Sequence, residues 1–139
     1  MKRRTFLGVV GAAVALTLAP SAFAGSYLDR VTVLLDGAER EGDLLRARLT
    51  DKEIVALVWT LAEARLGAAK KMEVPAAVAR AHPHLLLVLE HSERAAAAGA
   101  DGDYKKLLTH ITSARDEARI LRALLAEMGF PLPPPRTRE

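Results

Sequence analysis

The sequence contains no cysteine and few aromatic residues, and both shortages limit what the protein can be. Without cysteine the chain can form no disulfide, thiol nucleophile, iron–sulfur cluster or covalent c-type haem attachment. Aromatic residues make up only 4% of the chain and hydrophobic residues 50%, most of them alanine and leucine. A sheet protein of this size would use more β-branched and aromatic residues, so the composition favours helices.

The positive net charge is concentrated at the N-terminus. The formal net charge is +3, and Lys2, Arg3 and Arg4 lie in a stretch of ten residues that has no acid. Setting these three aside leaves 17 of the 20 basic residues, which balance the 17 acidic ones. A neutral body with interspersed charges lacks the basic stripe that binding to nucleic-acid phosphates needs. We therefore expect no nucleic-acid partner.

Residues 1–24 have the organisation of an export signal. The three basic residues precede an apolar run from Phe6 to Ala19, Pro20 follows it, and Ala22-Phe23-Ala24 supplies a small-x-small cleavage site. The run is shorter than the ~20 residues that a membrane span takes. We therefore expect cleavage near Ala24 and a mature chain without a transmembrane helix.

The segment Lys2-Arg3-Arg4-Thr5-Phe6-Leu7-Gly8 resembles the twin-arginine (Tat) export motif, Ser/Thr-Arg-Arg-x-Phe-Leu-Lys. The paired arginines and Phe-Leu match, whereas Lys2 and Gly8 depart from the pattern. The resemblance covers the signal alone and implies a bacterial protein exported in a folded state, often with a cofactor or in company with a partner. An ordinary secretory signal that contains two arginines is the alternative. Either route predicts a periplasmic or secreted protein.

Four stretches of the mature segment carry apolar residues at the three- and four-residue spacing of amphipathic helices. They cover about residues 28–49, 54–72, 75–98 and 104–128, and short turns connect them. A chain of 139 residues holds one domain at most. The pattern predicts an all-α, up-down-up-down four-helix bundle over residues 25–130, followed by a Pro-rich extended tail over 131–139.

Several local signals predict where these helices begin, end and bend. Pro83 cannot continue an unperturbed helix, because it lacks an amide hydrogen and crowds the preceding turn. We therefore predict a third helix kinked at Pro83, or a short helix followed by the main one. Gly99 is a natural C-cap for that helix, and Asp101 or Asp103 should cap the fourth. The capping box Thr50-Asp51-Lys52-Glu53 predicts a second helix that begins at Thr50. The inward residues of the second helix would be Ile54, Leu57, Val58, Leu61, Ala64, Ala68 and Met72.

Histidines are the only residues that suggest more than packing. Counting outward from the turn near residue 101, His91 lies ten residues before it and His110 nine after it. In an antiparallel hairpin the two imidazoles therefore lie at nearly the same height. His84 and Glu117, each seven residues further along, would form a second level ~10.5 Å away at a rise of 1.5 Å per residue. One metal ion cannot reach both levels, because its ligands lie within ~2.0–2.6 Å.

If His91 and His110 face the interior of the bundle, they could hold a transition metal. Glu39 or Glu63 of the opposite helices could complete the coordination shell. The pair could instead carry b-type haem, or transfer protons as a general acid and base. The remaining alternative is that these histidines are unconnected polar residues at helix boundaries.

Missing motifs argue against an enzyme. The sequence contains no Glu-x-x-His pair of the ferritin-like di-iron bundles, no His-Glu-x-x-His, no Gly-rich phosphate loop and no Gly-x-Ser-x-Gly. We therefore predict a non-enzymatic bundle that binds a partner protein or small ligand in the cell envelope, with a homodimer as one option. The alternative function is a periplasmic metal- or b-haem-binding bundle. Its candidate ligands are His91 and His110, with His84 and Glu117 as further candidates.

Overall fold

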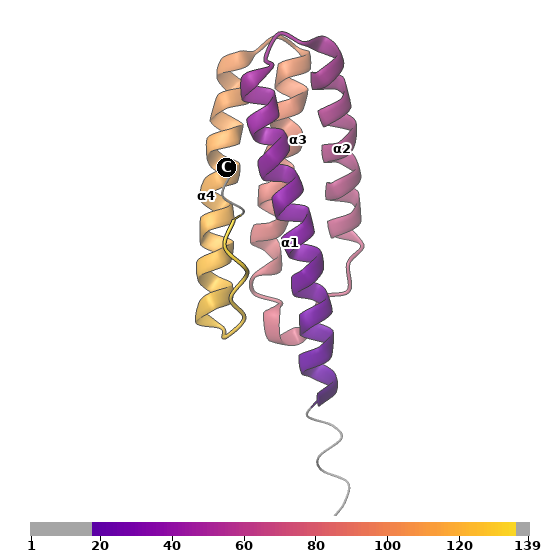
Figure 1. Ribbon diagram of the computed structural model, residues 1–139, viewed down its shortest axis with the longest axis vertical. Helices are drawn as coiled ribbons and strands as arrows, with labels where there is room; N and C mark the ends of the chain where they lie inside the picture. Colours follow the sequence, from indigo (N-terminus) through magenta and orange to yellow (C-terminus); the bar gives the residue numbers. More distant parts are fainter. Residues whose placement is uncertain (1–17, 136–139) are drawn as a thin grey trace, which may run out of the picture.

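The computed structural model describes residues 18–135, with side chains from Ala24 onward. Over this range the chain forms α1 (Leu18–Ala47), α2 (Lys52–Lys70), the 3-10 helix η1 (Ala76–Val78), α3 (His82–Ala100) and α4 (Tyr104–Glu127). The four long helices lie side by side with short connections, as Figure 1 shows, which confirms the predicted four-helix, all-α fold. Residues 1–17 of the predicted export signal and 136–139 of the predicted tail lie outside the described residues.

The helices surround a common axis. In Figure 1, α1 lies in front of α3, with α2 on one side and α4 on the other. The most extensive packing joins α3 to α4, followed by α3 to α2, and α1 packs less extensively against its neighbours. Within the described part of the chain, no helix is both long enough and apolar enough to cross a membrane.

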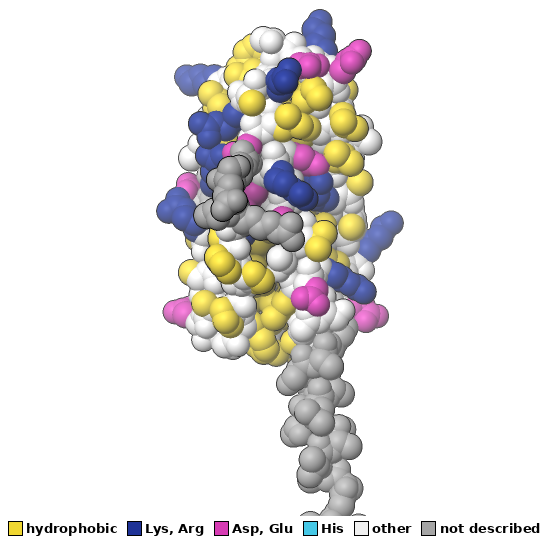
Figure 2. All heavy atoms as spheres, viewed as in Figure 1, with side chains coloured by type: hydrophobic (Ala, Val, Ile, Leu, Met, Phe, Trp, Pro, Cys, Tyr) yellow, Lys and Arg dark blue, Asp and Glu magenta, His cyan; other side chains and the backbone are white. Residues whose placement is uncertain are grey.

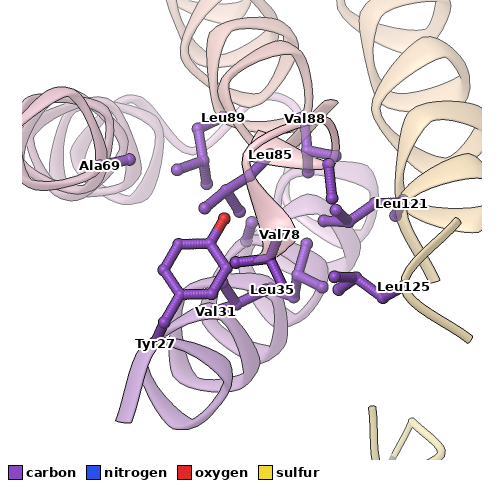
Figure 3. Close-up of a cluster of buried hydrophobic side chains, with 13 residues drawn as sticks. Tyr27, Val31, Leu35, Ala69, Val78, Leu85, Val88, Leu89, Leu121 and Leu125 are labelled. Atoms are coloured by element: carbon purple, nitrogen blue, oxygen red, sulfur yellow. The ribbon is translucent and has the colours of Figure 1, made fainter. Parts of the chain in front are cut away.

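The hydrophobic core has two parts that follow one another along the bundle. In the larger cluster, Tyr27, Val31 and Leu35 of α1 point toward leucines of α3 and α4 (Figure 3). The smaller cluster lies toward the α1–α2 and α3–α4 turns and is built around Leu45, Val55, Val58, Ala95, Ala96, Ala98, Leu107 and Ile111. Among the described residues no polar or charged residue is fully buried. Packing therefore holds the bundle together, and polar side chains lie at its edges.

The predicted inward stripe of α2 is wrong by about one residue. α2 buries Val55, Val58, Ala62 and Ala69, whereas Leu57 and Leu61 are 54% and 39% exposed. Both sets have helical spacing and share Val58, so periodicity alone cannot choose between them. The observed set turns small alanines toward the axis, which lets α2 approach α3 closely.

Aspartate side chains cap α2 and α4. Asp51 accepts a hydrogen bond from the Ile54 amide at 3.2 Å, so Asp51 and not Thr50 is the N-cap of α2. Asp103 accepts from the Lys106 amide at 3.1 Å, which confirms one of the two predicted caps of α4. In both cases the carboxylate pairs an amide that has no acceptor inside its own helix.

Pro83 lies at the start of α3 and not inside it, so the predicted kink at this residue is not confirmed. α3 starts at His82, and Pro83 lies in its first turn. The missing amide hydrogen has no cost there, because first-turn amides have no intrahelical acceptor. The 3-10 helix Ala76–Val78 precedes it, which agrees with the alternative of a short helix followed by the main one.

Gly99 is needed for close packing and is not the C-cap of α3. The left-handed residue of the α3–α4 turn is Gly102, with φ of 74°. Gly99 lies inside α3, where an added Cβ would be 2.8 Å from Leu107 Cδ1 and 3.2 Å from Val55 Cγ1. The absence of a side chain at Gly99 therefore allows α2 and α4 to approach α3.

The described part of the C-terminal tail folds back on the bundle. Gly129, with φ of 87°, reverses the chain after α4, and the tail then runs beside α4 toward α1 in Figure 1. Phe130 and Leu132 pack against the larger core cluster. The tail thus covers apolar surface at one end of the bundle.

Candidate functional site

Polar side chains join neighbouring helices at the outer edges of the bundle. At the α1–α2, α2–α3 and α1–α4 edges, an acidic side chain pairs with an arginine or accepts a hydrogen bond from the indole of a tryptophan. Figure 2 shows the α1 face, where basic and acidic side chains are interspersed and apolar side chains gather over its upper part. The contacts are Arg65–Glu41 (α2–α1), Trp59–Glu93 (α2–α3), and Arg115–Asp43 and Arg122–Glu39 (α4–α1). The α3–α4 edge differs, because histidines make its contacts.

His91 of α3 and His110 of α4 meet side by side, as counting from the turn predicts. Their Nδ1 atoms are 3.0 Å apart, their ring centroids are 5.3 Å apart, and the ring planes are inclined by 34°. Both side chains are partly buried. At this distance one Nδ1–H donates to the lone pair of the other Nδ1. The two imidazoles therefore hold a single proton between these atoms.

His84 and Glu117 form the second predicted level of the same edge. The Nδ1 of His84 lies 2.8 Å from Oε2 of Glu117, and the two side chains are 31% and 22% exposed. A carboxylate only accepts, so the imidazole donates its Nδ1–H to the carboxylate. The contact fixes α3 against α4 two helical turns from the His91–His110 pair.

We call the surface that contains both levels the histidine face. Its residues recur every three or four positions and so form one strip on each helix. Arg115 and Arg122 contact α1 from the other edge of α4, so the histidine face points away from α1. The face consists of His84, Leu87, His91 and Arg94 of α3, and Lys106, His110, Ser113, Glu117 and Ile120 of α4.

The surroundings of His110 favour its neutral form. Burial is the main cause that lowers the pKa of His110, and the positive charges of His91, Arg94 and Lys106 lower it further. The carboxylate of Glu93 opposes these effects. A neutral imidazole keeps a lone pair, which is the form that binds metals.

Neither glutamate proposed to complete a metal shell lies at the pair. Glu39 forms an ion pair with Arg122 on the α1–α4 edge, and Glu63 is exposed on α2. The expectation fails because the two histidines lie at the outer edge between α3 and α4 and do not face the interior. Across residues that the structure describes, no group of three or more potential ligands could hold one metal ion. This chain therefore offers two ligands at His91 and His110.

His82 has a structural role that the sequence did not reveal. The Tyr27 hydroxyl lies 2.9 Å from Nδ1 of His82, and Nε2 of His82 lies 3.2 Å from the Ala69 carbonyl. Because a carbonyl only accepts, Nε2 carries the hydrogen and Nδ1 accepts from Tyr27. The contact joins α1, α2 and α3. No motif signals it, since its partners are far apart in the sequence.

The same contact perturbs both titratable side chains. Burial raises the pKa of Tyr27 to about 12. Burial also lowers the pKa of His82, against the smaller opposing effect of the hydrogen bond to Ala69. His82 points toward α2 and His84 toward α4, so these two histidines cannot bind one metal ion together.

A cavity between the two core clusters is too small for an organic ligand. Its volume is about 30 Å³, whereas a cavity that binds benzene measures about 150 Å³. The cavity therefore represents a gap in the packing of the bundle. Small residues of all four helices contribute to its wall: Ala38, Gly42, Ala62, Ala95, Ala114 and Ala118.

No protein-family model matches the chain, and no curated protein or solved structure gives a significant match.

Proposed function

We propose that this chain is an exported, non-enzymatic binding protein of the bacterial cell envelope, and that its ligand is a divalent transition metal ion held by His91 and His110. The choice of a metal ion as the ligand is based on the 3.0 Å separation of the two Nδ1 atoms. The composition of residues 1–24, with its resemblance to a twin-arginine signal, supports export. Tyr27, the first large core side chain, lies on the mature side of the proposed cleavage near Ala24.

The spacing of the nitrogens favours copper or nickel over zinc. Binding by both Nδ1 atoms requires the hydrogen between them to move to Nε2 of its ring, which leaves a lone pair on each Nδ1. Two metal–nitrogen bonds of about 2.05 Å to atoms 3.0 Å apart then enclose an angle of about 94°. This is close to the right angle of a tetragonal Cu²⁺ or Ni²⁺ site. Tetrahedral Zn²⁺ places the nitrogens about 3.3 Å apart, which is wider than the observed separation. Cu²⁺ also has the highest affinity for nitrogen ligands in the divalent series.

The pair is poorly suited to haem. Axial ligands on opposite sides of an iron atom lie about 4 Å apart, with the macrocycle between them. The 3.0 Å separation leaves no room for such a group unless the two helices separate. Proton transfer by the same pair would make an enzyme only with a substrate site, and the sequence contains no catalytic motif that indicates one.

In this proposal, His84 and Glu117 support the site and are not ligands of the same ion. Their level is ~10.5 Å away along the helices, so one ion cannot bind both pairs.

Titration of the purified protein with Cu²⁺ tests the proposed ligand. We expect saturable binding, followed by the copper d–d absorption band and by isothermal calorimetry, and loss of that site in His91→Ala/His110→Ala. Ser113→Ala, on the same face, is the matched control and should bind as the parent does. Binding that survives in the double histidine variant would place copper elsewhere and refute the proposal. Absence of binding would refute it as well.

Export is tested separately by cell fractionation and by the mass of the purified protein. We expect a periplasmic or secreted chain that begins near Gly25. Replacing both Arg3 and Arg4 by lysine keeps the charge and should block a twin-arginine route while leaving a general secretory route open. A cytoplasmic chain that retains Met1 would refute export by either route.

A further inference from the structure

We infer that a second copy of this chain completes the metal site, so that one Cu²⁺ ion joins two molecules through four imidazoles. This inference rests on the proposed function, because it requires His91 and His110 to bind metal. Each chain provides two nitrogens, and among its described residues no cluster of three or more potential ligands exists. A twofold axis through the ion would bring a second, identical pair into place. Four nitrogens satisfy the tetragonal geometry that Cu²⁺ prefers.

Two exposed apolar side chains on the histidine face suit a contact between copies. Leu87 precedes His91 by four residues and is 37% exposed, and Ile120 follows Glu117 by three residues and is 45% exposed. Both belong to the histidine face. Leu87 lies one helical turn from His91, whereas Ile120 lies ten residues, or ~15 Å, along α4 from His110. In a twofold contact each chain contributes the same surface, so the two Leu87 side chains would lie near the ion and the two Ile120 side chains toward the ends of the interface.

The charges of the histidine face are arranged so that two copies attract each other. Arg94 and Lys106 lie on the side of the pair nearer the α3–α4 turn, and Glu117 lies on the opposite side. A twofold axis perpendicular to the bundle reverses the direction of one copy. The basic side chains of one copy would then face the Glu117 side of the other, which gives complementary charge across the interface.

Molar mass, copper stoichiometry and the number of coordinating nitrogens test this arrangement together. The purified protein is measured by sedimentation velocity without metal and during stepwise addition of CuCl₂ to beyond one equivalent per chain. Electron paramagnetic resonance of the same samples counts the nitrogens from their superhyperfine splitting. We expect a monomer without copper, a dimer with it, saturation at half an ion per chain and four equivalent nitrogens.

The other outcomes are distinguishable. A monomer with one copper per chain and two nitrogens would overturn this inference while leaving the proposed function intact. No copper binding at all would overturn both. A dimer that forms equally well without copper would show that the metal does not join the two copies.

Matched surface variants locate the interface. Leu87→Lys/Ile120→Lys places positive charge on the histidine face and should weaken the copper dimer by roughly tenfold or more, while each chain still binds copper through two nitrogens. Leu57→Lys/Leu61→Lys makes the same change at similarly exposed residues of α2 and should dimerise as the parent does. If the α2 variant loses the dimer and the histidine-face variant keeps it, the two copies meet elsewhere and the inference is wrong.

Discussion

Replacing Gly42 by alanine should stabilise the bundle by more than helix propensity alone predicts. Gly42 lies in α1 and lines the central cavity, and a Cβ built on it meets no atom within 4 Å. Alanine is better than glycine inside a helix by ~1 kcal/mol. A methyl group that enters the cavity adds up to ~0.8 kcal/mol from burial. We expect the free energy of unfolding to rise by about 1.5–2 kcal/mol.

Two other glycines serve as controls for this prediction. Gly67 of α2 is also free of neighbours within 4 Å but does not line the cavity, so Gly67→Ala should gain only the ~1 kcal/mol of propensity. Gly99→Ala should behave in the opposite way, because its Cβ would lie 2.8 Å from Leu107 Cδ1. Overpacking of this kind costs ~1–3 kcal/mol and offsets the gain in propensity. We therefore expect Gly99→Ala to be no more stable than the parent, or less stable by up to ~2 kcal/mol.

Urea unfolding followed by circular dichroism at 222 nm measures all three variants on one scale. The expected order of stability is Gly42→Ala, Gly67→Ala, parent and Gly99→Ala. Equal gains at Gly42 and Gly67 would mean that the new methyl group does not reach the cavity. A gain at Gly99 as large as that at Gly67 would refute the conclusion that α2 and α4 require a glycine there.

Three further predictions concern the polar contacts. The folded-state pKa values of His82 and His110 are lowered, so the unfolded chain takes up protons first as the pH falls. The free energy of unfolding should therefore decrease below about pH 6.5. A pH series with His82→Gln and His110→Gln should show a smaller decrease. Tyr27→Phe should lower the free energy of unfolding in urea by ~1–3 kcal/mol, because it leaves Nδ1 of the partly buried His82 without a donor. An ultraviolet titration of the parent protein should show Tyr27 ionising only near pH 12. Trp59→Phe removes the donor to Glu93 and should cost ~1 kcal/mol; an unchanged unfolding midpoint would show that this contact contributes nothing.

The position of the histidine pair along the bundle axis was predictable, because it follows from counting a few residues outward from one turn. His91 and His110 belong to one hairpin, and Gly102 and Asp103 mark its turn in the sequence. An error of one residue in locating the turn changes the relative position of the two imidazoles along the bundle axis by only ~3 Å. The second level follows from the same count, since His84 and Glu117 lie seven residues from the first.

Which face each helix turns toward the core was less predictable than the position of its residues along the bundle axis. In α2 two apolar sets share Val58, and only packing against α3 selects the one that contains Ala62 and Ala69. The direction of the histidines depends on packing in the same way. Small buried residues such as Ala95 of α3 and Ala114 of α4 let these helices approach closely. Close approach leaves no space for imidazoles between α3 and the bundle axis, so the rings lie at the outer edge.

That position at the edge determines which ligands the pair can collect. A histidine pair facing the axis would draw its remaining ligands from the opposite helices of the same chain, as Glu39 and Glu63 were expected to provide. At the outer edge the opposite helices are out of reach, and Glu39 instead neutralises Arg122. In the proposed copper site, the other half of the coordination sphere would face solvent, where water or a second copy of the chain would supply the remaining ligands. The close packing of α3 on α4 thus explains why, among the described residues, no third potential ligand joins the pair.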